Sequence, residues 1–382
     1  MNPPSHGEAA HWRVLLFAGY TKPAEHRKIE LLADAEAFEI VHVAGADSGR
    51  TPGRYPSANG RRSYTVRISP ALGRRGDPHR SFGWPPSYGM TRFRPHLIHY
   101  EGEVESLGAA QIVLLRWLLA RRAALVLTTW QNIRRPRSRL VRLLNDMNLA
   151  AAQYVLGASE EAVAVLRAQG YRRATSVLPI VGLDTRVFYP RPAAALRMQL
   201  GLDGFVVGYI GRLVPEKGLD TLLHAVAQAQ ARPHLLLVGS GPEKAALQGL
   251  ADRLGVASRC RFVEAVPYED VPDYMNLLDL LALPSRTTVH WKEQFGRVLV
   301  EAMACRVAVA GSNSGAIPEV IGDAGRIFPE GDAAALAGIL DELAGDTGTR
   351  SALAERGFQR AVGQYAIERI AADTLVVWRC LL

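Results

Sequence analysis

The sequence predicts an α/β protein made of two Rossmann-like domains, each with a doubly wound parallel sheet. Short apolar runs of strand length alternate with amphipathic helical segments along the chain, as in parallel sheets. The chain has 382 residues, 48% of them hydrophobic, which is enough for two packed cores. A proline-spaced connector runs from Phe188 to Pro192. We therefore place domains at residues 1–185 and 186–365, followed by a C-terminal helix at 366–382.

The first half opens with a buried strand, Arg13 to Gly19, and a helix at 24–37. Further strands are predicted at 39–44, 64–68, 97–100, 124–129, 154–157 and 175–179, and further helices at 106–120 and 160–169. Two stretches rich in glycine and proline, 45–62 and 69–90, are predicted to be irregular. We interpret His99 as a core residue at a strand end.

The second half repeats the alternation. Strands are predicted at 205–210, 235–238, 261–263, 280–283, 307–311 and 326–328, and helices at 220–229 and from about Phe295 onward, with the last helices ending near Trp378. The turn Gly239-Ser240-Gly241-Pro242 is similar to a dinucleotide fingerprint. Lys244 stands where the third glycine is needed, which argues against a nicotinamide cofactor.

The three cysteines, Cys260, Cys305 and Cys380, lack metal-ligand spacing and indicate packing thiols in a reducing compartment. The N-terminus has no pattern of a signal peptide, and the most apolar stretch, 111–130, is interrupted by arginines. We therefore expect a cytoplasmic protein without a spanning helix.

Charge is unevenly distributed along the chain. Residues 1–185 carry 25 Lys and Arg against 15 Asp and Glu, and the remainder carries 20 against 22. The first half is thus strongly basic, and this favours an acidic surface or acceptor as its partner. An arginine-rich composition of surface positions explains the same numbers.

A phosphate site is indicated after the strand at 205–210. The strand ends in a glycine turn that holds two cations five residues apart, Arg212 and Lys217, between Gly211 and Gly218. Both side chains can converge on one phosphate group.

Two carboxylates bracket the helix start near Phe295. Glu293 precedes it, and Glu301 lies about two turns inside, roughly 9 Å further along the helix. Free N–H groups at the helix start suit a diphosphate, and each carboxylate can accept hydrogen bonds from sugar hydroxyls. A bare pair with this spacing is also explained by the helix dipole and a solvated helix face.

Taken together, these motifs resemble the retaining glycosyltransferases of family 4, which have the GT-B fold. The resemblance is carried by Gly211-Arg212, Lys217-Gly218, Pro284-Ser285, Glu293 and Glu301 with Phe295-Gly296 and Ala302-Met303, and Gly315 followed by Pro318-Glu319. It covers about 180 to 330 almost continuously and is partial before that.

The resemblance implies two domains that face a central cleft. The first would bind the acceptor and the second a nucleotide diphosphate-sugar, while the helix at 366–382 would cross back to the first. It implies donor binding by Gly19, Gly211, Gly239, Phe295, Gly296 and Glu301, and catalytic roles for Glu293, Arg212, Lys217 and Gln131.

The sequence departs from the family pattern at two places in the first half. The family has a Gly-Gly pair after its first strand, where Gly19-Tyr20 stands here. It often has a histidine where Gln131 stands, and an amide can accept a hydrogen bond but cannot act as a base. Arg306 and Ala308 replace a usual Gly and Pro, where they alter packing more than chemistry.

The expected reaction is retaining hexosyl transfer (EC 2.4) without a metal or other cofactor. Asp-x-Asp, the usual diphosphate metal motif, occurs nowhere in the sequence, so Arg212 and Lys217 must offset the leaving charge. With no evident nucleophile, we expect attack on the face that the diphosphate leaves. The acceptor would be a glycan, a glycolipid or a small molecule.

Two other functions remain open at this stage. Glu293 and Glu301 could serve as the acid and base of a glycoside hydrolase, although the phosphate cations argue against it. The altered glycine pair and the missing histidine favour a non-catalytic protein that binds nucleotide-sugars or membranes.

The stretch from Arg134 to Leu144 is predicted to open a helix with five arginines before an apolar face. Such helices lie on anionic membranes, which would place the protein peripherally on the inner membrane face. A solvated helix with a core-facing stripe fits the same pattern. Nucleic acid is not expected as a partner, because no recognition motif accompanies the charge.

Overall fold

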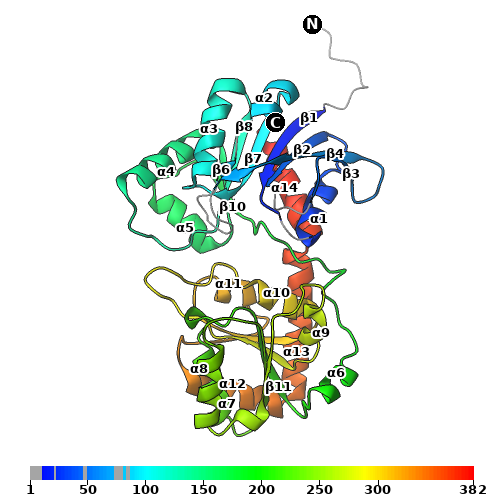
Figure 1. The fold of residues 1–382 in the computed structure, drawn as a ribbon, viewed down its shortest axis with the longest axis vertical. Helices are drawn as coiled ribbons and strands as arrows, with labels where there is room; N and C mark the ends of the chain where they lie inside the picture. Colours follow the sequence, from blue (N-terminus) through cyan, green and yellow to red (C-terminus); the bar gives the residue numbers. More distant parts are fainter. Residues whose placement is uncertain (1–10, 21–22, 46–49, 73–80, 83–86) are drawn as a thin grey trace. The chain divides into compact units, whose positions relative to one another are not determined.

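A computed structural model describes residues 11–20, 23–45, 50–72, 81–82 and 87–382. Contacts divide the chain into two compact units (Figure 1). The first contains the described residues up to Gly182 together with Ile367–Leu382, and the second is Leu183–Ala366. Each unit has its own largely parallel sheet, which confirms the predicted fold class.

The first unit is built on an eight-stranded sheet of order β10-β9-β8-β7-β1-β2-β4-β3. Its strands are β1 (Trp12–Ala18), β2 (Phe38–Gly45), β3 (Gly53–Pro56), β4 (Ser63–Ser69), β7 (Leu97–Glu103), β8 (Ala124–Thr129), β9 (Tyr154–Gly157) and β10 (Ala174–Val177). All neighbours are parallel except β3 and β4. A separate hairpin pairs β5 (Ala71–Leu72) with β6 (Ser81–Phe82).

Helices cover both faces of this sheet, because successive side chains of a strand point to opposite faces. Leu16 of β1 belongs to the core formed with α1 (Pro23–Leu32) and α14 (Ile367–Leu381). Leu15 belongs to the core on the other face. That face is covered by α2 (Ser87–Phe93), α3 (Leu107–Leu119), α4 (Arg139–Ala151) and α5 (Glu160–Ala168).

The C-terminal helix returns to the first unit, as predicted. α14 packs against α1 (Figure 1). The Trp378 indole Nε1 donates to Nδ1 of His99 at 3.1 Å, and both side chains are fully buried. Burial lowers the pKa of His99 well below its usual value, so the ring is neutral. The interpretation of His99 as a core residue is confirmed.

The second unit has a six-stranded parallel sheet of order β13-β12-β11-β14-β15-β16. Its strands are β11 (Val206–Ile210), β12 (His234–Val238), β13 (Cys260–Val263), β14 (Leu280–Leu283), β15 (Ala308–Ser312) and β16 (Arg326–Phe328). Its helices are α6 (Ala194–Gln199), α7 (Leu219–Gln228), α8 (Lys244–Arg253), α9 (Val271–Met275), α10 (Arg297–Ala304), α11 (Ile317–Ile321), α12 (Ala333–Gly345) and α13 (Thr347–Arg360), with the short turns η1 (Pro215–Lys217), η2 (Ala257–Arg259) and η3 (Ala361–Tyr365).

Several predictions about local structure are wrong. The helix predicted at 24–37 ends at Leu32. The basic helix begins at Arg139 rather than near Arg134, because Pro136 interrupts the preceding stretch and Ser138 caps the helix by accepting from the Val141 N–H. The stretch 45–62 contains β3, which pairs with β4. Cys380 is exposed rather than packed, while Cys260 and Cys305 are buried as expected.

In the part of the chain that the structure describes, no helix is long and apolar enough to cross a membrane. The predicted irregular stretch 69–90 contains β5, β6 and the start of α2, so this prediction is also wrong where the structure describes it. Its residues 73–80 and 83–86 lie outside the described residues.

Candidate active site

The strand order of the second sheet changes direction between β11 and β14, whose carboxyl ends are neighbours. Ligands of open α/β sheets bind at such points. β11 leads into Gly211 and Arg212, and β14 leads into the loop that carries Glu293. The predicted phosphate residues and the first predicted carboxylate therefore reach the same edge of the sheet.

Lys217 and Glu293 are in direct contact although they are 76 residues apart in sequence. Lys217 Nζ lies 2.6 Å from Glu293 Oε2. The Ser285 hydroxyl donates to the same carboxylate oxygen at 2.8 Å. The ammonium group also lies 4.8 Å from the centroid of the Trp291 ring, within cation–π distance. The carboxylate and the cation are therefore fixed at one place.

A glycine supports the backbone at Glu293. The Ala316 N–H donates to the Glu293 carbonyl at 3.0 Å. Gly315 has φ +54°, and a Cβ built on it would lie 2.0 Å from that carbonyl oxygen. Only glycine permits this close approach without a shift of the backbone.

Helix α10 begins directly after the Glu293 loop. Gly296 stands at its N-cap with φ +76° and offers no side chain to bond the first helical N–H groups. Those groups and the positive end of the helix dipole are suited to an anion. The buried Phe295 ring packs edge-on against Tyr365, with 5.5 Å between ring centroids, and anchors the loop.

Glu301, the second predicted carboxylate, is buried on α10 with partners of its own. It accepts from Arg297 Nε at 2.7 Å and from the Tyr268 hydroxyl at 3.2 Å. Burial and the Glu301 charge together raise the pKa of Tyr268, so this phenol is a stable donor. Glu293 and Glu301 thus have separate sets of hydrogen-bond partners.

A pocket of about 230 Å³ lies beside the turns that follow β11 and β12. Gly211, Gly239, Ala265 and Val266 are among the residues that line it. A Cβ on Gly239 would lie 1.9 Å from the Gly211 carbonyl oxygen, so the two turns touch through their backbones.

Arg212 also lines this pocket. Its side chain is 68% exposed, and its nearest carboxylate oxygen, on Glu216, is 3.6 Å away. The guanidinium is therefore accessible to a ligand, whereas Lys217 is held by Glu293.

Two predicted residues belong to the first unit. Gly19 follows β1, is exposed, and has space around the position of a Cβ. Gln131 follows β8 and is buried, and its Oε1 accepts from Arg137 at 2.5 Å.

Sequence reasoning missed a buried charged group near the switch point of the first sheet, between β1 and β7. Lys28 Nζ lies 2.5 Å from Glu101 Oε1, and the Tyr20 hydroxyl donates to the other carboxylate oxygen. Glu101 follows the predicted strand at 97–100, which is a signal in the sequence. Nothing in the sequence indicates that Glu101 pairs with Lys28, which lies 73 residues away.

Glu103 lies at the same end of β7. It accepts from the Thr129 hydroxyl at 2.8 Å and from the Trp130 N–H at 3.1 Å. Burial nevertheless raises its pKa to about 6.

Among the described residues, no group of three or more His, Cys, Asp or Glu side chains is arranged to hold a metal ion.

Known proteins share this fold and its sequence motifs. The family model described as glycosyl transferases group 1 matches residues 196–360. The GDP-mannose-dependent alpha-(1-6)-phosphatidylinositol monomannoside mannosyltransferase of Mycolicibacterium smegmatis is 33% identical over 278 residues, which cover 67% of this chain and 72% of that protein. The chain belongs to the glycosyl transferases group 1 family.

The chain is also similar to other known proteins. A D-inositol 3-phosphate glycosyltransferase of Kribbella flavida is 29% identical over 62% of this chain and 59% of its own length. The crystal structure of HepE from Anabaena in complex with UDP has a TM-score of 0.74 at 22% identity and covers 97% of this chain and 100% of that chain. Sucrose-phosphate synthase from Thermosynechococcus elongatus gives 0.70 at 22%, with 97% and 99% covered. These likenesses show the GT-B fold.

Membership of the group 1 family decides between the functions left open by the sequence. The chain is a hexosyltransferase that transfers a sugar from a nucleotide-sugar donor to an acceptor. The hydrolase and the non-catalytic binding protein are not supported.

Proposed function

We propose that the protein is a retaining, metal-independent glycosyltransferase whose second unit binds the nucleotide diphosphate-sugar and whose first unit binds the acceptor. The observation that carries this proposal is the Lys217–Glu293 contact at the carboxyl ends of β11 and β14. It places a cation and a carboxylate beside the uncapped start of α10, where a diphosphate and its sugar meet.

In this proposal Arg212, Lys217 and the first N–H groups of α10 stabilise the negative charge that develops on the leaving diphosphate. In many enzymes a divalent cation stabilises this negative charge. The sequence contains no Asp-x-Asp motif to hold such a cation. The acceptor attacks the face that the diphosphate leaves, and a diphosphate oxygen takes its proton.

The two carboxylates have different tasks. Glu293 binds hydroxyls of the donor sugar and stabilises the positive charge on the sugar in the transition state. Glu301 binds the ribose hydroxyls. The glycines at 211 and 239 let the backbone come close to the nucleotide. Both glycines line the pocket of about 230 Å³, and we assign the nucleotide to this part of the unit. Phe295 and Gly296 position α10, while Gly19 and Gln131 contact substrates from the first unit.

We further propose GDP-mannose as the donor and an inositol-containing glycolipid or inositol phosphate as the acceptor. The support is the named activities of the relatives from Mycolicibacterium smegmatis and Kribbella flavida. A lipid acceptor agrees with the excess of Lys and Arg in the first half. We therefore place the protein in the cytoplasm, peripherally on an anionic membrane that it contacts through Arg134 to Arg142.

A donor panel that includes GDP-mannose, assayed by nucleotide release and by mass spectrometry of the product, tests this proposal. Lys217→Ala should lower turnover by about a hundredfold to a thousandfold, the range for loss of one preorganised charge donor. Arg212→Ala should do the same. Lys244→Ala is a matched control, since this lysine of the second unit is paired with Glu264 instead. Unchanged turnover in both Arg212→Ala and Lys217→Ala would show that the diphosphate binds elsewhere.

A further inference from the structure

Helix α4 buries two polar side chains and exposes several apolar ones. Asn145 and Asn148 are buried on its inner side, where Asn148 Nδ2 donates to the Val104 carbonyl at 2.7 Å. Its outer side carries Leu140 at 64% exposure and Leu143 at 66%. These two residues are three apart and therefore neighbours on one helix face. The predicted apolar stripe does not face the core at this end of the helix.

Helix α3 packs against α4 and also exposes large apolar side chains. They are Leu107, Leu114, Trp117, Leu118 and Leu119, all at least 40% exposed. Two adjacent helices thus present apolar side chains to the surroundings, which marks an interaction surface rather than scattered exposure. We call the exposed residues of α3 together with Leu140, Leu143 and Met147 of α4 the α3–α4 face.

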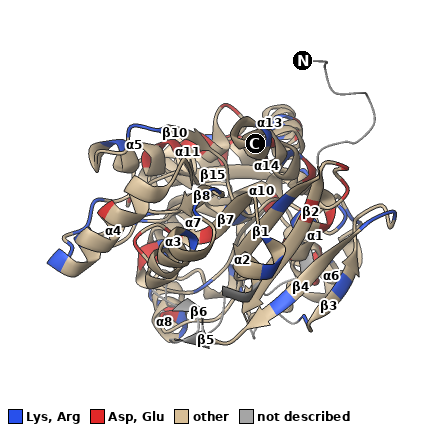
Figure 2. Ribbon diagram, turned by 90° about the horizontal axis from the view of Figure 1, so that it is seen from above, with Lys and Arg blue, Asp and Glu red and all other residues tan. Residues whose placement is uncertain are grey.

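Arginines border this face. Arg121 follows α3, with its guanidinium 4.8 Å from the Trp117 ring centroid. Arg139 and Arg142 lie in the first turn of α4, and Arg134 lies in the chain before it. Within the described part of the chain no ion-pair partner is found for these three. In Figure 2, blue Lys and Arg positions recur along α4 and the chain beside it.

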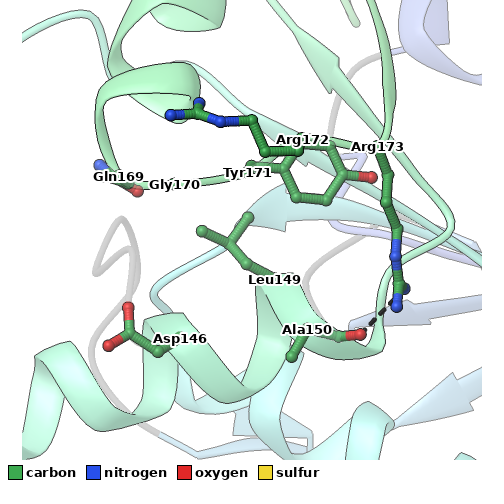
Figure 3. Close-up of a pocket in the computed structure, with 8 residues that line it drawn as sticks. All are labelled: Asp146, Leu149, Ala150, Gln169, Gly170, Tyr171, Arg172 and Arg173. Carbon is green, nitrogen blue, oxygen red and sulfur yellow. Dashed lines mark hydrogen bonds between the residues drawn. The ribbon is translucent and has the colours of Figure 1, made fainter.

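Two adjoining pockets lie beside α4, one near its start and the other along its C-terminal half. One, of about 450 Å³, is lined by Arg134, Arg135, Arg137 and Arg142. The other, of about 320 Å³, includes Arg172 and Arg173 (Figure 3). Asp146 and Gln169 line both pockets.

Not all of these charges are available to a ligand. Glu105 pairs with Arg137, and Arg173 donates to the Ala150 carbonyl at 2.9 Å, the dashed line in Figure 3. Arg134, Arg135 and Arg142 remain as the accessible cations of the larger pocket.

We propose that the α3–α4 face lies on a bilayer that contains anionic phospholipids, with the apolar side chains among the acyl chains and head-group phosphates at Arg134 and Arg142. The proposal rests on the lipid acceptor and membrane location given above, and it assigns the contact to particular residues. The positive charge indicates what binds to the α3–α4 face, because arginines beside an exposed apolar face are suited to an anionic lipid surface. A tryptophan at the edge of such a face is typical of the membrane interface.

Sedimentation with phosphatidylcholine vesicles, with and without phosphatidylglycerol, tests the contact. The parent should bind the anionic vesicles more tightly, and less so as salt rises. Leu140→Ser with Leu143→Ser should weaken binding by about tenfold or more, since two leucines no longer enter the bilayer. Arg134→Gln with Arg142→Gln should weaken it by about thirtyfold. Met198→Ser is the matched control, because Met198 is 80% exposed on α6 of the second unit.

Trp117 gives an independent readout. Its emission should shift to shorter wavelength when anionic vesicles are added, and the shift should be lost in Trp117→Phe while binding remains. A shift that persists in Trp117→Phe would place the contact elsewhere and refute this assignment.

Nucleotide release without acceptor separates this proposal from the proposed function, because donor turnover does not need the membrane. The leucine and arginine variants should keep the parent's donor turnover. Vesicle binding by the leucine variant at the parent's level overturns the proposal. The proposal is also overturned if the parent does not bind vesicles but forms a dimer that the leucine variant disrupts. The α3–α4 face would then contact a second copy of the chain.

Discussion

Exchange of either carboxylate for its amide should separate the tasks of Glu293 and Glu301. Glu293→Gln should lower kcat more than it changes KM, because a negative charge next to the sugar matters most when the sugar becomes positive in the transition state. Glu301→Gln should mainly raise the donor KM, since the amide can still bind ribose, but more weakly.

The structure gives the sizes of these effects. The Glu293 carboxylate accepts from Lys217 at 2.6 Å and from Ser285 at 2.8 Å, so it is held in place before the donor arrives. Loss of one preorganised charge lowers kcat by about a hundredfold to a thousandfold. Glu301 makes charge-assisted bonds worth about 1 to 3 kcal/mol, which corresponds to an increase in KM of about 5-fold to 150-fold.

Stability must be measured together with activity. Glu293→Gln also removes an ion pair whose side chains are only 14% and 10% exposed. We expect a cost of about 2 kcal/mol and a fall in Tm of a few degrees. Kinetics should therefore be run well below the Tm of the variant.

Calorimetry with a nucleoside diphosphate that lacks the sugar provides the decisive assay. Glu293→Gln should bind it about as tightly as the parent does, and Glu301→Gln should bind it more weakly. Equal losses of affinity in both variants, or full affinity in both with no turnover, would refute the division of tasks.

Three further predictions concern the charge on the diphosphate, the backbone at Glu293 and the first unit. A chelator should leave activity within about twofold, because the protein supplies the positive charge itself; full loss that magnesium or manganese restores would contradict this. Gly315→Ala should lower turnover by displacing the Glu293 carbonyl, whereas Gly331→Ala, with φ +76° and nothing within 4 Å, should cost only about 1 kcal/mol of stability; equal kinetics in the two variants would argue against a positioning role. Glu103→Gln should stabilise the protein by on the order of 1 to 2 kcal/mol above pH 6. The reason is that the pKa of Glu103 in the folded protein, about 6, exceeds the ordinary 4.5, so the charged carboxylate is disfavoured in the folded state. The gain in stability should disappear as the pH falls below 4.5, and thermal unfolding measured across this pH range tests it.

Much of the fold could be predicted because apolar runs identify strands without knowledge of their partners. The strand expected at 205–210 is β11, Val206–Ile210, and the helix expected at 220–229 is α7, Leu219–Gln228. The start of α4 was misplaced because the arginines before Pro136 look helical in composition. β3 was missed because Gly53 and Pro56 at its ends are typical of loops.

The candidate site could be predicted in its residue types but not in its contacts. The motifs identify Lys217 and Glu293 as members of one site, yet their ion pair depends on the order of β11 and β14 in the sheet. The contact of Gln131 could not be predicted either, since nothing in the sequence indicates that Arg137 donates a hydrogen bond to its amide oxygen.

The way the chain enters and leaves the second unit has a consequence for biosynthesis. Leu183 and Ala366 pair as a parallel bridge, so the unit begins and ends at one point and is inserted whole into the first. A ribosome therefore synthesises all of residues 183–366 before it makes α14. Phe38 and His99 are made long before Trp378, the ring that both of them contact, so these two contacts can form only after the whole second unit has been synthesised. The core of the first unit thus becomes complete only after the second unit has been made.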